Sequence, residues 1–98
     1  MFQSVRLDTS LIALVFGVFD GSVAPALHRE LDGVVADGVT DIVIDLCQAT
    51  HVDEGAVAVL AAAAVTVLGV GGRLWLALGP GSVTAIEDVG AIRAVFSR

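Results

Sequence analysis

The stretch from Asp41 to Leu60, DIVIDLCQATHVDEGAVAVL, constrains the fold of this chain more than any other. It begins with a largely β-branched run from Ile42 to Leu46, which is typical of a strand buried on both faces of a parallel sheet. From Gly55 onward the residues are rich in alanine and uncharged until Arg73, which favours a helix. The stretch therefore predicts a strand, a polar loop and a helix. In open α/β sheets, binding sites form where a strand ends and a helix begins.

The remaining pattern predicts strands that alternate with helices after an opening hairpin. The first helix has apolar residues at helical spacing between 27 and 35, with Ser22 as the expected N-cap and Pro25 in its first turn. The expected elements, in chain order, are a hairpin of strands 5–7 and 11–18, a helix closed by Gly38, the strand 42–46, a helix ending at Gly69 or at Gly71–Gly72, a strand 74–78, a short helix from Ser82 to Val89, and a last short strand or extended tail at 92–96.

Charge and cysteine content narrow the function. Eight aspartates and three glutamates against five arginines give a net charge of −6, which argues against nucleic acid and anionic membranes and is compatible with a basic partner surface. The single Cys47 excludes an internal disulfide and indicates the cytoplasm. The uncharged run 55–72 is near the minimum length of a membrane span, but its alanines and glycines indicate a buried helix and its turn. We expect no signal peptide and no direct membrane insertion.

Several local patterns, in the same order and spacing, resemble the STAS family, named for sulfate transporters and anti-sigma factor antagonists. They cover nearly the whole chain and are Gly17-Val18-Phe19-Asp20, Ile44-Asp45-Leu46, Val52-Asp53, Gly71-Gly72-Arg73-Leu74 and Ile86-Glu87-Asp88-Val89-Gly90. The resemblance implies one STAS-like α/β domain over residues 1–98. Its mixed sheet would have four to five strands, an N-terminal hairpin, otherwise mostly parallel strands, and about three helices mainly on one side.

The resemblance also implies a cytoplasmic, non-enzymatic regulator of bacterial transcription that binds an anti-sigma factor or a related kinase-fold protein. In such antagonists, phosphorylation of a loop Ser or Thr ends the binding. Aligned without gaps, the family's D-S-S/T-G falls on Asp53-Glu54-Gly55-Ala56, so Gly55 occupies the position of the hydroxyl. A one-residue gap would instead bring Gly55 onto the family's Gly, and either alignment leaves no Ser or Thr at the switch position. We therefore expect no phosphorylation at Gly55. An alternative reading is an accessory subunit of an ABC-type lipid or solute transport complex, since STAS-like domains also attach to such machinery.

Each polar residue of the loop has a structural and a functional reading. Asp53 is suited to cap the helix, and Glu54 in the first turn opposes the helix dipole or supplies permanent negative charge near where a phosphate would arrive. Thr50 is the substitute hydroxyl, although loop threonines usually bond their own backbone. The expected partner-binding residues are Asp20, Gly21, Ser22, Thr50, His51, Asp53, Glu54, Gly55, Ala56 and Val57.

No chemistry beyond binding is expected. His51 and Asp53 lack the companions of a metal site or an acid–base set, so we expect no metal, no cofactor and no catalytic residue. Cys47 follows a buried strand and is expected to be a small core residue. The second helix is apolar on every face except at Thr66, which predicts an apolar patch beside the acidic loop. A homodimer through that helix is a further expectation.

Overall fold

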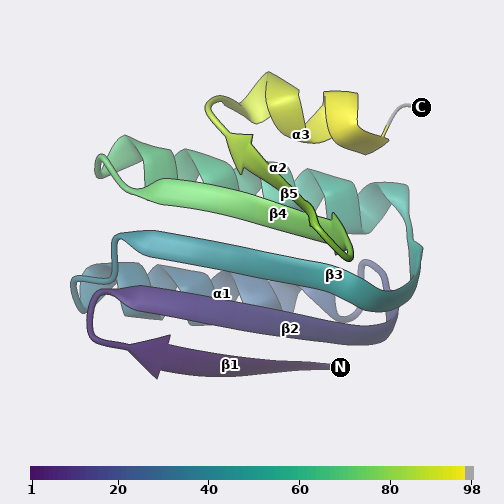
Figure 1. Cartoon of the computed structure of the whole chain (residues 1–98), viewed down its shortest axis with the longest axis horizontal. Coiled ribbons are helices and arrows are strands. Elements are labelled where there is room, and N and C mark those ends of the chain that lie inside the picture. The colour runs from purple at the N-terminus through teal and green to yellow at the C-terminus, as the bar shows by residue number, and fades with distance from the viewer. Residues whose placement is uncertain (97–98) are drawn as a thin grey trace.

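The computed structural model describes residues 1–96, which form five strands and three helices around one sheet (Figure 1). In chain order they are β1 (Phe2–Leu7), β2 (Ser10–Phe19), α1 (Ala24–Ala36), β3 (Asp41–Val52), α2 (Glu54–Gly69), β4 (Arg73–Gly79), β5 (Ser82–Ile86) and α3 (Val89–Phe96). The strands are ordered β1-β2-β3-β4-β5, with the two inner pairings parallel and the two outer pairings antiparallel. The predicted α/β class, mixed sheet and N-terminal hairpin are confirmed.

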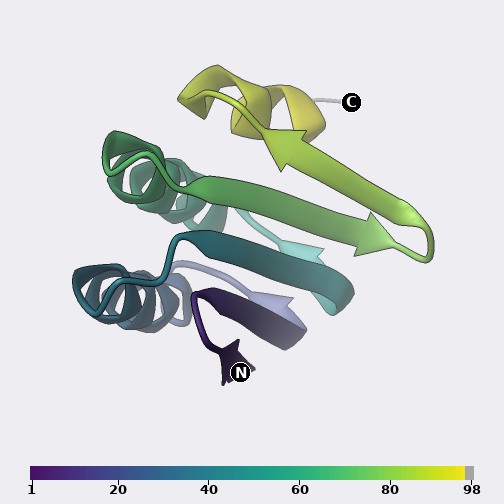
Figure 2. The ribbon, with the colours of Figure 1, turned by 60° about the vertical axis from the view of Figure 1, so that its left-hand side comes forward.

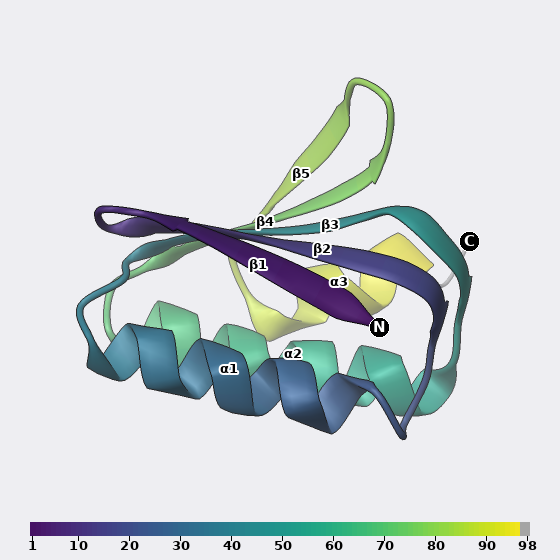
Figure 3. The ribbon, with the colours of Figure 1, turned by 90° about the horizontal axis from the view of Figure 1, so that it is seen from below.

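The helices α1, α2 and α3 all lie on the same side of the sheet (Figure 3). Helix α2 is the middle one, in contact with α1 on one flank and with α3 on the other. In Figure 2, α1 and α2 are seen nearly end-on, side by side against the sheet. This arrangement confirms the prediction that the helices lie mainly on one side. Within residues 1–96, no helix combines the length and the apolar character needed to cross a membrane.

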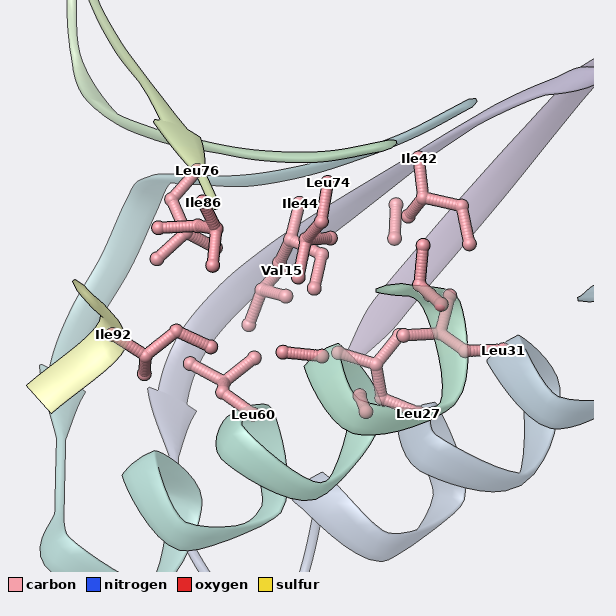
Figure 4. Close-up of a cluster of buried hydrophobic side chains, with 14 of the residues drawn as sticks. Val15, Leu27, Leu31, Ile42, Ile44, Leu60, Leu74, Leu76, Ile86 and Ile92 are labelled. Atoms are coloured by element: carbon pink, nitrogen blue, oxygen red, sulfur yellow. The ribbon is translucent and has the colours of Figure 1, made fainter. Parts of the chain in front are cut away.

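The core fills the space between the sheet and this helix layer (Figure 4). Along β3, Ile42, Ile44 and Leu46 are buried, whereas the alternating positions from Val43 to Cys47 are only half-buried. The prediction that this strand is buried on both faces is therefore wrong, because helices cover one face alone. The side chains that meet in the core are Leu11, Ile42, Leu74 and Ile86 from the sheet and Leu27, Leu31, Leu60 and Ile92 from the helices.

The carboxyl-terminal prediction is also wrong, because it exchanged a strand and a helix. Residues 82–86 form β5, which pairs with β4 in a hairpin closed by the Gly79-Pro80-Gly81 turn. Residues 89–96 form α3, whose first turn is capped by Asp88 through a 2.9 Å bond from the Ala91 N–H to its Oδ1. The β-branched residues Val83, Thr84 and Ile86 favour a strand, and β5 pairs with β4 at the sheet edge. This tertiary pairing outweighs the local cap signal of Ser82.

Two helix boundaries differ in detail from the sequence analysis. The N-cap of α1 is Val23 and not Ser22, with no side-chain cap bond of its own. At the other end Asp37 is the C-cap, and Gly38 follows it at φ +97°, a conformation that glycine adopts without strain. Helix α2 ends at Gly69, one of the two predicted positions.

Candidate functional site

The two junctions predicted to bind a partner meet at one edge of the sheet. Strands β2 and β3 are parallel neighbours, so their carboxyl ends lie together, one leading into α1 and the other into α2. The Asp53 N–H donates to the Phe19 carbonyl at 3.2 Å. A Cβ added to Gly55 would lie 3.4 Å from the Gly21 Cα. The segment Asp20–Ser22 and the start of α2 therefore form one continuous surface.

The polar loop expected from Thr50 to Gly55 is much shorter than predicted. Strand β3 continues through Val52, and Asp53 is the single residue between it and α2. The pairing of β3 with β2 shifts register at two places. At the second, Gly17 pairs with Ala49 and Val18 pairs with His51, so Thr50 is an extra residue of β3. Such bulges let the strand continue without regular alternation. Thr50 and His51 are thus exposed strand residues, and within residues 1–96 neither makes a side-chain hydrogen bond.

Asp53 is the N-cap of α2, as the capping interpretation predicted. Its Oδ1 accepts a hydrogen bond from the Ala56 N–H at 2.8 Å, and its carbonyl accepts from the Val57 N–H at 3.0 Å. These bonds satisfy two N–H groups that a helix start leaves without partners. Ala56 and Val57 themselves are buried, with 0% and 5% of their surface exposed. Their side chains hold the helix start against the core and leave almost no surface to solvent.

Asp20 organises the neighbouring junction. Its Oδ1 accepts from the Ser22 N–H at 2.9 Å, the Ser22 Oγ–H at 2.6 Å and the Val23 N–H at 3.2 Å. The hydrogen bond from the Ser22 hydroxyl, followed by the backbone bond from the same residue, lowers the pKa of the Asp20 carboxyl. Asp20 therefore stays ionised to lower pH than a free aspartate, and it fixes the turn that brings Gly21 to Gly55.

Glu54 supplies the most exposed charge of the site. Its side chain is 87% exposed and its Oε1 lies 3.1 Å from Nη1 of Arg93 on α3. Phe96 and Val57 lie beside this pair and line a shallow hollow with it. Sequence reasoning missed Arg93 and Phe96 because it assigned residues 92–96 to a strand or tail. The capping motif at Asp88, followed by apolar residues at helical spacing, was the signal that could have placed them.

The other candidates do not assemble into a catalytic or metal site in the described part of the chain. Residues 1–96 contain no cluster of three or more His, Cys, Asp or Glu side chains able to hold a metal ion. Cys47 is half-exposed, so the expectation that it is a small core residue is wrong. The hydrogen bond to the Asp45 carboxylate, with smaller contributions from burial and charge repulsion, raises the pKa of the Cys47 thiol. A raised thiol pKa disfavours the thiolate, which is the nucleophilic form.

Removing the cap of α2 gives a direct test of this geometry. We expect Asp53→Ala to lower the free energy of unfolding by about 1 kcal/mol, because the Ala56 N–H loses its partner. Asp53→Asn keeps an oxygen acceptor at the same place and is the matched control, with stability close to that of the original chain. Urea unfolding followed by circular dichroism measures both. Equal stability of the alanine and asparagine variants would contradict the capping role.

Comparisons with known proteins agree with this architecture. Residues 4–89 match the family model described as "Mlab, STAS domain". A search of curated proteins finds no match. Among solved structures, the unphosphorylated anti-sigma factor antagonist SpoIIAA is similar with a TM-score of 0.70 and 19% identity, over 78% of this chain and 71% of that one.

Two further structures share the fold. The phosphorylated form of SpoIIAA, a Bacillus cell fate determinant, gives a TM-score of 0.71 at 17% identity, covering 98% of this chain and 80% of that chain. A structure described as Mglu gives a TM-score of 0.68 at 18% identity over 76% of this chain, but this region is only 18% of that protein. At such identities these likenesses establish the fold.

Proposed function

This chain belongs to the STAS family, in the branch described as "Mlab, STAS domain", and from that premise we propose that it is a non-enzymatic, cytoplasmic regulatory module that binds an anti-sigma factor or a related kinase-fold protein. The fold shared with the anti-sigma factor antagonist SpoIIAA supports this partner class. The binding surface is the edge formed by Asp20–Ser22 and the first turn of α2, with the exposed residues Thr50 and His51 beside it. Nucleic acid is not a partner, since the net charge is −6.

The observation that carries the proposal is the contact between Gly21 and Gly55. It joins two helix starts into one surface without a large side chain between them, so a partner's backbone can approach closely. Three carboxylates border this surface, those of Asp20, Asp53 and Glu54. The Asp53 carboxylate caps α2 and the Asp20 carboxylate accepts hydrogen bonds within its own turn, whereas the Glu54 carboxylate is exposed. A partner with basic residues opposite Glu54 is therefore favoured.

Control by phosphorylation at the start of α2 is not part of the proposal. A Cβ at position 55 would face Gly21 and the Asp53 Oδ1, while the side chain at position 54 is the one that reaches solvent. Neither Glu54 nor Gly55 has a hydroxyl. Glu54 instead carries a fixed negative charge, and Arg93 at 3.1 Å partly balances it. The module thus binds its partner constitutively, with the exposed Thr50 as the remaining hydroxyl for any substitute switch.

The test is calorimetric titration of the purified domain with candidate anti-sigma kinases, with and without ATP, followed by the intact mass of the domain. Binding that persists with ATP and an unchanged mass is the expected result. Glu54→Arg should weaken binding about tenfold or more, since it places a cation against a basic partner surface and against Arg93. Glu87→Arg, the same charge reversal on an exposed residue near the opposite end of β4, is the matched control and should leave binding unchanged.

Either of two results would remove the proposal. If none of the kinases binds, the partner class is wrong. If Glu54→Arg and Glu87→Arg weaken binding equally, the effect is one of net charge and the edge is not the binding surface. A phosphoryl group gained on Thr50 or Ser22 would leave the partner but overturn constitutive binding.

A second function, permanent attachment to a subunit of an ABC-type transport complex, is favoured by one observation. The outer side of α2 exposes a narrow apolar strip made of Ala58, Ala62 and Val65, and Val65 is 57% exposed. This strip is smaller than the sequence predicted, because Val57, Leu60 and Val67 are buried between the sheet and the neighbouring helices. Copurification with such a subunit that is lost in Val65→Glu but kept in Glu54→Arg would support this function over the first.

A further inference from the structure

Helices α2 and α3 meet beside the candidate site and leave a hollow between them. Ile92, which is fully buried on α3, points toward Leu60 of α2 (Figure 4). Residues three or four apart share a face of a helix, so Val57 and Phe96 continue this contact toward the start of α2. The hollow there has a volume of about 250 Å³. The residues that line it are Glu54, Val57, Arg93 and Phe96.

The hollow combines apolar walls with a charged rim. Val57 keeps only 5% of its surface exposed, and Phe96 is half-buried against the core. At the rim, Oε1 of Glu54 accepts a hydrogen bond from Nη1 of Arg93 at 3.1 Å. The second carboxylate oxygen, Oε2, accepts no hydrogen bond from any group of residues 1–96. An apolar wall below an exposed carboxylate fits a long side chain that ends in a cation.

Size and shape narrow the occupant further. Pockets that bind small molecules usually have volumes of about 300–1,000 Å³, so this hollow suits a single side chain better than a free ligand. Arginine fits better than lysine, because its planar guanidinium stacks on an aromatic ring and donates two parallel hydrogen bonds to a carboxylate. Phe96 supplies the ring and Glu54 the carboxylate.

The local charge attracts a cation even though Arg93 is present. Three carboxylates border this surface, those of Asp20, Asp53 and Glu54, and they outnumber the one guanidinium that lines the hollow. Arg93 is 57% exposed, and an ion pair between exposed side chains contributes little to stability. A guanidinium from outside therefore displaces Arg93 from Glu54 at little cost. Arg93 lowers the affinity for that guanidinium, because it competes for the same carboxylate.

We propose that this hollow receives an arginine side chain of the protein partner, whose guanidinium replaces that of Arg93 on the Glu54 carboxylate and stacks on Phe96. The inference rests on the proposed function for the protein that carries the arginine. Glu54 belongs both to this hollow and to the edge where Gly21 meets Gly55, so one partner covers the two together. Arg93 is then a competitor within the chain that the partner has to displace.

Titration of the whole chain with N-acetyl-arginine amide tests the hollow without a partner. Amide signals in the ¹H–¹⁵N correlation spectrum should shift with a Kd on the order of 1–10 mM, the weak affinity expected of one side chain. The largest shifts should occur at Gly55, Arg93 and Phe96. N-acetyl-lysine amide at the same ionic strength is the matched control, and it should bind at least about threefold more weakly because it has no planar group.

Two variants assign the contacts, and circular dichroism establishes that each is folded. Glu54→Gln should remove the saturable shifts, because it removes the charge that attracts the guanidinium. Phe96→Leu keeps an apolar wall without a ring, and it should lower the affinity for the arginine amide to that for the lysine amide. The absence of saturable shifts around the hollow in the original chain would overturn the proposal. Equal affinity for the two amides in the original chain would overturn the choice of arginine.

Calorimetry with an anti-sigma kinase that binds the chain tests the competition. Arg93→Gln should tighten binding about threefold or more, because Glu54 loses its partner within the chain. Arg73→Gln removes the same charge at the other end of the sheet, where Arg73 pairs with Asp41, and should change the affinity less than about twofold. Equal affinities of the two variants would overturn the competition. If no kinase binds, the proposed function is wrong, and the arginine titration still decides whether the hollow accepts a guanidinium.

Discussion

Phe19→Ala is expected to lower the free energy of unfolding by about 3–5 kcal/mol, the range found when a buried phenylalanine is truncated. Phe19 is 0% exposed and is among the largest fully buried side chains. It is the last residue of β2, and its carbonyl accepts the Asp53 N–H that ties the two junctions together. The loss is a large share of the total stability, which for a chain of this length is about 5–15 kcal/mol. Urea unfolding is the measurement.

Phe16→Ala is the control for this prediction. Phe16 lies on the same strand but is 37% exposed, on the side away from the helices. The same chemical change there should cost roughly 1 kcal/mol, since much less apolar surface leaves the core. Both variants are measured at the same chain concentration. Similar losses for the two variants would mean that Phe19 does not anchor the core at this edge.

Gly72→Ala should cost about 3 kcal/mol, although the change adds a single methyl group. A Cβ at Gly72 would lie 2.7 Å from the Thr40 carbonyl oxygen and 2.9 Å from the Val67 carbonyl oxygen. Both carbonyls belong to the backbone and already accept hydrogen bonds, from the N–H groups of Arg73 and Gly72. Moving them apart therefore separates α2 from the start of β4 and weakens those bonds. Thermal and urea unfolding together measure the loss.

Gly33→Ala provides the opposite expectation for an identical substitution. Gly33 is inside α1, and a Cβ there would meet nothing within 4 Å. Alanine loses less backbone entropy than glycine on forming a helix, so this variant should be more stable by about 0.5–1 kcal/mol. If Gly72→Ala proves neutral while Gly33→Ala stabilises, the chain can relax around position 72 and the close approach is not a constraint.

Local sequence signals were sufficient to predict a helix, a strand or a cap where the residues of that one element determine its structure. The apolar run from Ile42 and the alanine-rich segment after Gly55 predicted the central strand and α2, and Asp53 was correctly read as a cap. They failed at the carboxyl terminus. There the β-branched residues of 83–86 formed an edge strand because β4 offered free backbone groups, and α3 formed because α2 offered an apolar flank. A short window of sequence around residues 82–96 does not indicate that β4 and α2 will lie beside it.

The candidate site shows the same division. The sequence indicated Asp20, Ser22, Asp53 and Glu54 as important polar residues, but it misassigned the capping of α1 and made the loop at 50–55 too long. Bulges in β3 depend on its pairing with β2, which brings Thr50 and His51 into the strand. The ion pair of Glu54 with Arg93 joins residues 39 positions apart, so no local sequence pattern predicts it.

By itself, the sequence determined the class of the fold, the order of most elements and the family, because these follow from apolar periodicity, turn residues and short motifs that act over a few neighbours. Only the tertiary structure decided which side of the sheet is covered. Along β2 both sides are apolar, whereas the side of β3 that carries Val43 also carries Asp41 and Asp45. The placement of the helices α1, α2 and α3 together leaves Ile12, Val43 and Trp75 on the uncovered side. That choice depends on how the crossovers pack, a long-range property that no single segment encodes.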